Sequence, residues 1–447
     1  MTYDLIVLGS GPGGQRAAVQ AAKLKKKVLI VERDQIGGSC LHSGTIPSKT
    51  LREAALAPDC FVTDPLKSVM EQKDRVISAE AKVIQEQLRR NSVETAFGEG
   101  TLDGKNTVVI RAKDGSTRQV EGHHIVIATG TRPFRDPAIP FNDHSIFDSD
   151  TILRIPKLPG KIAILGAGVI GCEYASIFAK LGVSVLLFDR RAELLRSVDQ
   201  EVIQILDQHF RKSGVQILLN TYPEGAMNED PSSHKVSFLA GGQRHEVDAV
   251  LVCMGRDGNS RELHLEKAFI TPNNRGLIPV NEKYQTTMPH IYAVGDIIGA
   301  PALAASSAEQ GRLAAAHALA QSQEVFPASF PYGIYTIPEI SSVGAQESDL
   351  TSQGIPFVVG RAFYKELARG KIIGDDDGFL KIIVHQENHK ILGVHAIGTG
   401  ATELIHIGQV ALALGTKVEF LVNNVFNYPT LAEAYKVAAY NAYNKLT

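Results

Sequence analysis

The sequence predicts an α/β fold with two parallel-sheet domains built on βαβ units, followed by a smaller α+β domain toward the C-terminal end. Two glycine-rich turns each follow a short apolar strand and precede a helical segment. After each helical segment comes a second apolar strand that ends in an acidic residue. From about residue 332 onward, the pattern changes to short strands with turns and then to helices. Alternation of strand and helix is typical of doubly wound sheets, and the later change of pattern indicates a separate domain.

The two βαβ units have the same internal spacing. The first has a strand at residues 5–8, the turn Gly9-Ser10-Gly11-Pro12-Gly13-Gly14, and a strand at residues 27–31 before Glu32. The second has a strand at residues 161–165, the turn Gly166-Ala167-Gly168-Val169-Ile170-Gly171, and a strand at residues 183–188 before Asp189. In both copies the acid stands 23 residues after the first glycine. The repeat predicts two sites of one kind.

Gly-x-Gly-x-x-Gly between a strand and a helix is the pattern of a dinucleotide site. The first glycine permits a tight turn, the second lets a pyrophosphate approach the backbone, and the third lets helix and strand pack closely. The helix N-terminus attracts the phosphates, and the acid accepts hydrogen bonds from a ribose hydroxyl. One such motif is weak evidence against an ordinary glycine-rich turn, but two copies with equal spacing predict two bound dinucleotides.

Composition limits the class of protein. A chain of 447 residues is too long for a single ordinary core, and a formal net charge of −2 indicates neither nucleic acid nor an anionic membrane as partner. The four cysteines (Cys40, Cys60, Cys172 and Cys253) are far apart, so we expect no disulfide framework, and no metal site. The N-terminal apolar run is too short for a signal peptide, and no stretch is long enough to span a bilayer. A cytoplasmic location is expected.

Two segments resemble the redox centre of the flavin disulfide reductases but lack its thiol chemistry. Residues 37–49 read Gly-Gly-Ser-Cys-Leu-His-Ser-Gly-Thr-Ile-Pro-Ser-Lys, and the second cysteine of those enzymes is replaced by Thr45. Residues 426–433 read Phe-Asn-Tyr-Pro-Thr-Leu-Ala-Glu, and the acid/base histidine is replaced by Tyr428. A lone Cys40 cannot form an intramolecular disulfide, and a phenol is a poor proton shuttle near neutrality. We therefore expect no dithiol relay.

With both replacements, the sequence closely resembles the soluble pyridine nucleotide transhydrogenases. These enzymes belong to the class-I pyridine nucleotide-disulfide oxidoreductases but lack the redox disulfide. The resembling segments are residues 40–49, 335–340 and 426–430. The resemblance implies a discontinuous Rossmann-like FAD domain at residues 1–150 and 271–331. It also implies a Rossmann-like NAD(P) domain at residues 151–270 and a C-terminal α+β dimerisation domain at residues 332–447.

The resemblance also implies which residues bind the cofactors. Residues 125–130 look like a buried strand that ends in the family's Ala-Thr-Gly turn, and Asp296 resembles the aspartate that binds the flavin ribityl chain. A helix N-cap is the alternative interpretation of Asp296. On the FAD side we expect Gly9, Gly11, Gly13, Gly14, Glu32, Arg33, Gly38, Ser39, Cys40, Thr45, Lys49, Thr129, Gly130 and Asp296. On the NAD(P) side we expect Gly166, Gly168, Gly171, Glu173, Asp189, Arg190, Arg191 and Gly255.

Four residues are candidates for the reaction centre. In the resembled family, a lysine at the Lys49 position sits by flavin N5 and pairs with a glutamate that maps to Glu173. A cation there would stabilise the anionic reduced flavin, whereas the alternative is a solvated helix pair. Cys40 is either a thiol that touches the flavin or, as we favour, a small packing residue. Thr45 is a compact polar group that cannot form a thiolate adduct.

The cluster of residues 189–191 is a candidate for cofactor choice. Asp189 suits the 2′-hydroxyl of NAD, whereas Arg190 and Arg191 could pair with the 2′-phosphate of NADP. The alternative is that both arginines are merely solvated.

The predicted reaction is the reversible exchange NADPH + NAD⁺ ⇌ NADP⁺ + NADH, with hydride passing through flavin N5 and one nicotinamide site used in turn. NAD(H) and NADP(H) are thus substrates and FAD the cofactor, in a homodimer or higher homo-oligomer. Two alternatives remain: an NAD(P)H oxidase or diaphorase, and an E3-like FAD-binding subunit with no dithiol activity of its own.

Overall fold

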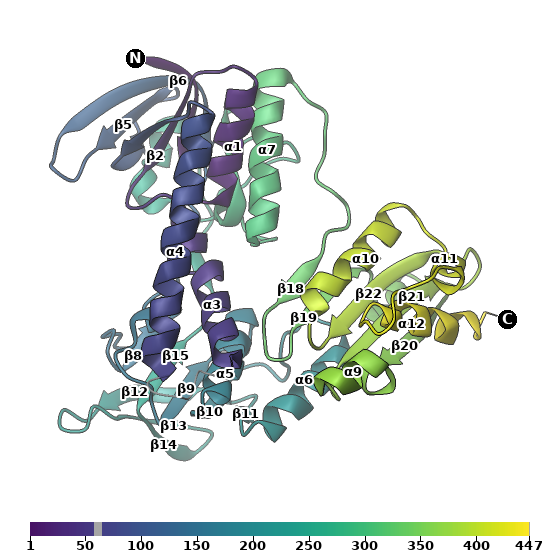
Figure 1. Ribbon diagram of the computed structural model, residues 1–447. Coiled ribbons are helices and arrows are strands. Elements are labelled where there is room, and N and C mark those ends of the chain that lie inside the picture. Colours follow the sequence, from purple (N-terminus) through teal and green to yellow (C-terminus); the bar gives the residue numbers. More distant parts are fainter. Residues whose placement is uncertain (58–64, 447) are drawn as a thin grey trace. The chain divides into compact units, whose positions relative to one another are not determined.

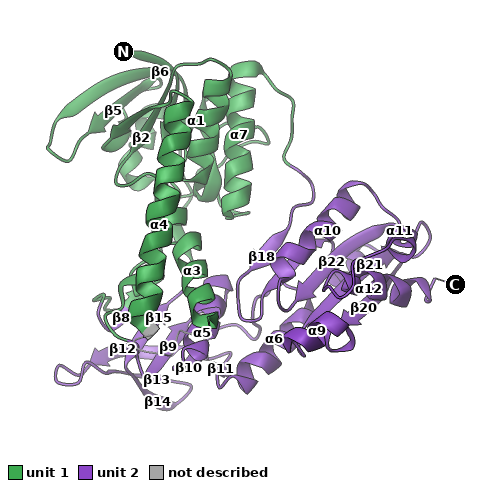
Figure 2. Ribbon diagram, in the orientation of Figure 1, with its two compact units in different colours: residues 1–143, 147–157, 254–326 green, residues 144–146, 158–253, 327–447 purple. Residues whose placement is uncertain are grey.

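The computed structural model describes residues 1–57 and 65–446. Cys60 lies outside these ranges. The chain forms two compact units (Figure 2), each of which is described by itself. Unit 1 contains residues 1–143, 147–157 and 254–326, and unit 2 contains residues 144–146, 158–253 and 327–447. The three-domain division predicted from the sequence is finer than these two units and stays a prediction.

Unit 1 is built on a seven-stranded sheet. Its strands run in the order β3-β2-β1-β6-β5-β4, and β17 pairs with β6. The bounds are β1 (Thr2–Leu8), β2 (Val28–Glu32), β3 (Glu94–Phe97), β4 (Glu99–Leu102), β5 (Thr107–Arg111), β6 (Thr117–Ile127) and β17 (Ile291–Ala293). The pairs that join β3, β2, β1, β6 and β17 are parallel, so their carboxyl ends meet at one edge. The chain therefore returns to the first sheet at β17, which pairs parallel with β6.

Helices α1 (Pro12–Lys23) and α7 (Ala304–Ala320) lie side by side in unit 1 (Figure 1). They approach closely because glycines face each other. A Cβ added to Gly311 would lie 2.0 Å from the carbonyl oxygen of Gly13, and one added to Gly13 would lie 3.1 Å from that of Ser307. Gly13 therefore acts in helix packing.

The remaining helices of unit 1 follow the first βαβ unit. The described residues between β2 and β3 include the helices α2 (Gly38–His42), α3 (Thr45–Leu56) and α4 (Pro65–Arg90). Apolar residues recur along α4 at helical spacing, as is typical of a helix with one buried face. The short elements are β7 (Thr131–Pro133), β16 (Arg256–Gly258), η2 (Ile152–Arg154), η3 (Arg261–Leu263), η4 (Leu265–Ala268) and η5 (Gly295–Ile298). Strands β7 and β16 pair antiparallel.

Unit 2 begins with the second βαβ unit. Strands β11, β10, β9 and β15 are neighbours in that order, and all three pairs are parallel. Strands β12, β13 and β14 form a separate antiparallel sheet. The bounds are β9 (Lys161–Leu165), α5 (Val169–Lys180), β10 (Ser184–Phe188), α6 (Gln200–Lys212), β11 (Gln216–Leu218), β12 (Pro223–Glu229), β13 (Val236–Ala240), β14 (Gln243–Val247) and β15 (Ala249–Val252). The chain passes between the two units at β8 (Ile146–Asp148).

The C-terminal part of unit 2 is a five-stranded antiparallel sheet with strand order β18-β19-β22-β21-β20. The bounds are β18 (Tyr332–Ile334), β19 (Ile340–Gly344), α8 (Glu347–Ser352), β20 (Phe357–Phe363), η6 (Tyr364–Glu366), α9 (Ala368–Ile373), β21 (Phe379–His385), β22 (Ile391–Ile397), α10 (Ala401–Ala413), α11 (Val418–Asn423) and α12 (Glu433–Tyr443). Helices α10 and α12 pack on the sheet around a buried apolar core (Figure 1). The predicted fold class, α/β with a C-terminal α+β domain, is confirmed.

Within residues 1–57 and 65–446, no helix combines the length and the apolar character that a bilayer crossing requires.

Candidate functional site

In the glycine turn between β1 and α1, two glycines are tightly packed and a third faces open space. Gly9 has φ +99°, and a Cβ there would lie 2.5 Å from the carbonyl oxygen of Ala128. A Cβ on Gly14 would lie 2.0 Å from the carbonyl oxygen of Gly9. Gly11 is the N-cap of α1, and a Cβ there would meet no atom within 4 Å. Two glycines are thus required by the fold, whereas the space over Gly11 is open at the positive end of the helix.

The second turn, between β9 and α5, repeats this arrangement. A Cβ on Gly166, at φ +114°, would lie 2.4 Å from the carbonyl oxygen of Cys253, and one on Gly171 would lie 1.8 Å from that of Gly166. Gly168 is the N-cap of α5 and has open space where its Cβ would be. In both turns, therefore, two glycines are tightly packed and the glycine at the helix N-cap, of α1 or of α5, faces open space.

Each predicted acid is hydrogen-bonded to its own glycine turn. Glu32 accepts hydrogen bonds from the N–H of Ser10 at 3.0 Å and from its hydroxyl at 2.6 Å. Asp189 accepts one from the N–H of Ala167 at 2.7 Å. Ser10 and Ala167 each follow the first glycine of their turn. The acids therefore hold the turns in shape, and their binding of a ribose stays a prediction.

In unit 1, three of the predicted residues, Thr45, Lys49 and Asp296, act on the pKa of a fourth, Cys40. Cys40 lies in α2, and Thr45 and Lys49 lie in the first half of α3. Burial raises the pKa of the Cys40 thiol and the charge of Asp296 adds to this rise, whereas the Thr45 hydroxyl and the Lys49 charge oppose it. The net shift is upward, so the thiol stays protonated near neutrality. A protonated thiol is compatible with a small packing residue and with a thiol that touches the flavin, so both interpretations of Cys40 stay open.

Asp296 is a largely buried carboxyl group with weak partners. It lies inside η5, whose N-cap is Val294, so the alternative interpretation of Asp296 as a helix N-cap is wrong. Its oxygens lie 3.5 Å from the hydroxyls of Thr131 and Ser307. Burial raises the pKa of Asp296, and the charge of Arg256 opposes the rise. A ligand hydroxyl would relieve this desolvation, which fits the predicted role toward a ribityl chain.

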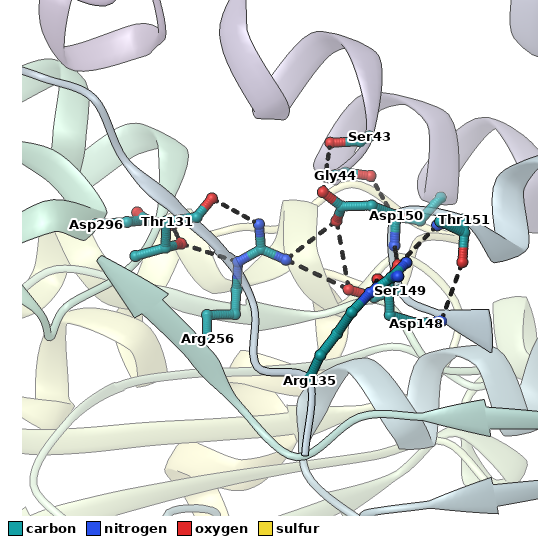
Figure 3. A network of polar contacts seen from close by, with 11 residues as sticks. Ser43, Gly44, Thr131, Arg135, Asp148, Ser149, Asp150, Thr151, Arg256 and Asp296 are labelled. Carbon is teal, nitrogen blue, oxygen red and sulfur yellow. Dashed lines mark hydrogen bonds and ion pairs between the residues drawn. The ribbon is translucent and has the colours of Figure 1, made fainter. Parts of the chain in front are cut away.

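Arg256 organises a polar network that the sequence did not predict (Figure 3). Its guanidinium donates to the hydroxyl of Thr131 at 2.9 Å and to the carbonyl oxygen of Thr131 at 3.0 Å. It also contacts Asp150 at 3.2 Å and the hydroxyl of Ser149 at 3.3 Å. The hydroxyl of Ser43, just after α2, donates to Asp150 at 3.2 Å. Arg256 therefore supports the loops around the first site.

The other predicted FAD-side residues occupy several positions in unit 1. The side chain of Thr129 donates to the carbonyl oxygen of Asn259 at 3.0 Å, and the N–H of Asn259 donates to Gly130. A Cβ on Gly38 would lie 2.9 Å from the Cα of Gly11, so Gly38 lines the open space of the first turn. Ser39 is exposed, and Arg33 is exposed and pairs with Asp34 at 3.4 Å.

Three further residues singled out in the sequence are Gly255, Glu173 and Tyr428. Gly255, predicted on the NAD(P) side, belongs to unit 1, and its carbonyl oxygen accepts from the N–H of Phe134. Glu173 lies buried on α5 in unit 2 and accepts a hydrogen bond from the N–H of Tyr335 at 2.8 Å. Lys49 and Glu173 belong to different units, so their pairing stays a prediction. Tyr428 lies in unit 2 and is 72 % exposed.

The two arginines after Asp189 have different environments. Arg191 binds Asp189 through two guanidinium hydrogen bonds, of 3.0 and 2.9 Å. Burial would raise the pKa of Asp189, but hydrogen bonds from Arg191 and Ala167 outweigh it and hold the pKa below its usual range. The guanidinium of Arg190 lies 4.0 Å from the ring centroid of Tyr222. Both arginines are exposed and also have protein partners, so their binding of a 2′-phosphate stays a prediction.

An open pocket of about 420 Å³ lies beside the second glycine turn. It is lined by Gly168, Val169, Arg191, Leu195, Arg196 and Ser197. Sequence reasoning missed Arg196, although its position five residues after Arg191 in the loop before α6 was visible. The pocket combines an open helix N-terminus with two cations, and this arrangement suits a phosphorylated ligand.

Comparison with known proteins agrees with this architecture. Residues 3–311 match the profile of the pyridine nucleotide-disulphide oxidoreductases, and residues 330–439 match the dimerisation domain of that family. The chain is 44 % identical to a soluble pyridine nucleotide transhydrogenase of Mycobacterium bovis, with 99 % of this chain and 98 % of that protein covered. A soluble pyridine nucleotide transhydrogenase of Pseudomonas putida is 43 % identical, with 99 % of each covered.

Among solved structures, the HOCl-induced flavoprotein disulfide reductase RclA of Escherichia coli superposes with a TM-score of 0.90. It is 26 % identical, and 98 % of this chain and 99 % of that chain are covered. The paired glycine turns, the lone Cys40 and the full-length similarity together place this chain in the pyridine nucleotide-disulphide oxidoreductase family, among the soluble pyridine nucleotide transhydrogenases.

Proposed function

We propose that this protein is an FAD-dependent NAD(P)⁺ transhydrogenase that catalyses NADPH + NAD⁺ ⇌ NADP⁺ + NADH. The observation that carries the proposal is the single Cys40 beside Thr45, in a scaffold with two matching dinucleotide turns. The scaffold suits transfer between two dinucleotides, whereas a disulfide substrate would require a second thiol. The names of the relatives at 43–44 % identity support the same activity.

The residues of the first site fit FAD. Gly11 and Gly38 leave the helix start open to a pyrophosphate, Glu32 stands at the end of β2 for a ribose, and Asp296 offers an under-paired carboxyl group. When bound, FAD supplies an acceptor and donor of hydride. We assign to Lys49 the stabilisation of negative charge near the reacting centre, with Glu173 as its proposed partner. Thr45 and Cys40 fill the space that a redox disulfide would take.

The second site would bind both nicotinamide dinucleotides in turn. Gly168 at the start of α5 would receive the pyrophosphate, and Asp189 would accept from the 2′-hydroxyl of NAD(H). Arg191 and Arg196, which line the pocket beside Gly168, would bind the 2′-phosphate of NADP(H). Arg256 is not assigned to phosphate binding, because its guanidinium is engaged with Thr131, Ser149 and Asp150 in unit 1.

We propose that the protein works in the cytoplasm as a homodimer or a higher homo-oligomer. The match of residues 330–439 to a dimerisation domain supports self-association. Exposed apolar side chains in this region support it too, namely Val410, Leu414, Phe420 and Val425. Residues around Tyr428 would then complete the active site of the partner.

Stopped-flow spectroscopy without oxygen tests the reaction directly. NADPH should bleach the flavin absorbance within one turnover, and thio-NAD⁺ added afterwards should restore it and form thio-NADH in equal amount. Oxygen consumption under NADPH alone should be much slower than this exchange. Flavin that NADPH reduces but thio-NAD⁺ does not reoxidise would contradict the proposal and favour an oxidase. Flavin that NADPH leaves oxidised would favour a binding subunit.

A further inference from the structure

A cluster of two histidines and a glutamate lies on unit 2. The His–Glu–His cluster consists of His144, Glu229 and His234. The Nε2 atom of His144 lies 3.0 Å from Oε1 of Glu229, and the Nδ1 atom of His234 lies 2.9 Å from the same oxygen. The side chain of Glu229 is 21 % exposed, whereas those of His144 and His234 are 51 % and 65 % exposed. The carboxylate is thus sheltered and the imidazoles are open to solvent.

The fold brings the three side chains together from two segments. Glu229 ends β12 and pairs with Val236 on β13, and His234 lies in the turn between these strands. The N–H of His234 donates to the carbonyl oxygen of Asp230 at 2.8 Å, and its φ is +56°. His144 stands where the chain enters unit 2, and the next residue, Ser145, accepts from the N–H of Val250 at 2.8 Å. Backbone contacts therefore anchor both segments.

The donor atoms suit a transition metal ion. Imidazole nitrogen and carboxylate oxygen are typical ligands of Zn²⁺, and the three donor atoms all lie within 4.8 Å of one another. Ligand bonds of about 2.0–2.1 Å at tetrahedral angles separate two ligand atoms by about 3.3 Å. The two nitrogen–oxygen distances in the cluster are slightly shorter than this. The imidazole rings are nearly perpendicular, with centroids 5.7 Å apart, so small ring rotations could direct both nitrogens at one ion.

Two charged residues beside the cluster have partners of their own, and the side chain of Ser145 also hydrogen-bonds to Glu229. Lys235 pairs with Glu246 at 2.9 Å, which directs its ammonium group to another partner. Oδ1 of Asp230 accepts from the N–H and the hydroxyl of Ser232.

We propose that the His–Glu–His cluster binds one divalent transition metal ion of the Zn²⁺ class, with water at the open fourth position. This departs from the sequence-based expectation of no metal. Sequence spacing did not indicate the site because His144 and Glu229 are 85 positions apart. The ion would link residue 144 to the β12–β13 hairpin, and its expected effect is to stabilise unit 2 locally, outside the proposed hydride-transfer machinery.

Calorimetric titration of the chelator-treated, FAD-loaded protein with Zn²⁺ tests the proposal. Wild type should bind about one ion per chain. Glu229→Gln, His144→Asn and His234→Asn should each weaken binding by about tenfold or more, because loss of a direct ligand exceeds the usual effect of an outer partner. Asparagine is chosen at residue 234 because it tolerates positive φ. The matched control is His264→Asn, since His264 is also exposed and has φ +54°. It should bind Zn²⁺ as wild type does.

Two further measurements keep the outcome decisive. FAD content and the melting temperature in chelator show whether each variant is folded, and anomalous scattering at the zinc edge locates the ion in crystals. The proposal is supported if the anomalous peak lies between His144, Glu229 and His234 and is absent from the variants. It is overturned if wild type binds no Zn²⁺, if the double variant His144→Asn/His234→Asn binds as tightly as wild type, or if the peak lies elsewhere.

Discussion

At the scale of single residues, each glycine turn contains glycines required by the fold and one that faces open space, where we propose that a ligand approaches. Gly14 and Gly171 face carbonyl oxygens at 2.0 and 1.8 Å from an added Cβ, so a side chain there would disrupt the apoprotein itself. Gly11 and Gly168 face open space. A side chain at Gly11 should therefore block only the first proposed site, and a side chain at Gly168 only the second, without unfolding the chain.

We expect Gly11→Val to fold but to purify without FAD, because its side chain would occupy the approach of the pyrophosphate. Gly168→Val should keep FAD and lose reduction by NADPH. The checks are the flavin absorbance of the purified proteins and the anaerobic reduction rate. Gly14→Val is the control for misfolding and should give little soluble protein. A Gly11→Val protein with a full complement of FAD would contradict the site assignment.

The thiol of Cys40 should be unnecessary for hydride exchange. Because burial raises its pKa, thiolate should form only at pH values above the usual thiol range near 8.5, and alkylation of Cys40 should accelerate only there. Mass spectrometry of the Cys40 peptide after timed iodoacetamide treatment measures this. Cys40→Ser should keep most of the transhydrogenase activity, and neither protein should reduce lipoamide or oxidised glutathione. Loss of activity in Cys40→Ser at normal FAD content would show that the thiol takes part.

Cofactor choice should depend on Arg196 more than on Arg190. Arg196 lines the pocket beside Gly168, whereas Arg190 lies over the ring of Tyr222. A lost charge-assisted hydrogen bond costs roughly 1.5–3 kcal/mol, and about 1.4 kcal/mol corresponds to a factor of ten. Arg196→Gln should therefore raise the KM for NADPH about tenfold and leave that for NADH nearly unchanged. Arg190→Gln is the matched control, and equal effects of both substitutions on NADPH would reject the pocket assignment.

At the scale of elements, a buried ion network joins α6, α8 and β21 within unit 2. The ammonium group of Lys381 on β21 is only 1 % exposed. It lies 2.5 Å from Asp199, the N-cap of α6, 2.6 Å from Glu347 on α8 and 3.5 Å from Glu201. Glu201 also pairs with Arg361 on β20. The network satisfies a buried charge, which would otherwise be costly.

Removal of Lys381 should destabilise unit 2 strongly. Lys381→Met leaves the buried Asp199 carboxylate without its cation, and we expect a loss of about 3–5 kcal/mol in unfolding free energy. Lys212→Met is the control, because Lys212 pairs with Asp377 at an exposed position, and its loss should cost about 1 kcal/mol or less. Urea unfolding followed by circular dichroism measures both. Similar midpoints for the two variants would show that the buried network contributes little.

At the scale of the whole molecule, self-association should depend on exposed apolar residues of the C-terminal domain. Val410 lies on α10, and Leu414 is the C-cap of that helix, one turn further on. Both side chains are exposed. Large exposed apolar residues at such spacing are typical of an interface when the domain belongs to a dimerising family.

The double variant Val410→Glu/Leu414→Glu should shift the protein from dimer toward monomer, because the interface would bury two unpaired charges. Light scattering coupled to size exclusion measures the mass. Val83→Glu is the control, since Val83 is exposed on α4 in unit 1 and should leave the mass unchanged. A double variant that keeps the wild-type mass would place the interface elsewhere.

Sequence reasoning reached features that depend on local sterics and periodicity. The two glycine turns, their acids and helix α4 were all predictable, because a tight turn requires glycine and a half-buried helix repeats apolar residues. The replacements Thr45 and Tyr428 were also visible, because they occur within recognisable segments.

The tertiary structure alone decided which partner each polar side chain has. The contacts of Arg256 with Thr131 and Asp150, the pocket position of Arg196, and the His–Glu–His cluster were not predictable. Even Asp189 and Arg191, two positions apart in the sequence, form an ion pair that the sequence did not indicate. The physical reason is that a hydrogen bond requires donor and acceptor within about 3 Å, and the path of the folded chain sets that distance. Residue identity and spacing therefore determined which chemistry was possible, whereas packing determined which groups meet to perform it.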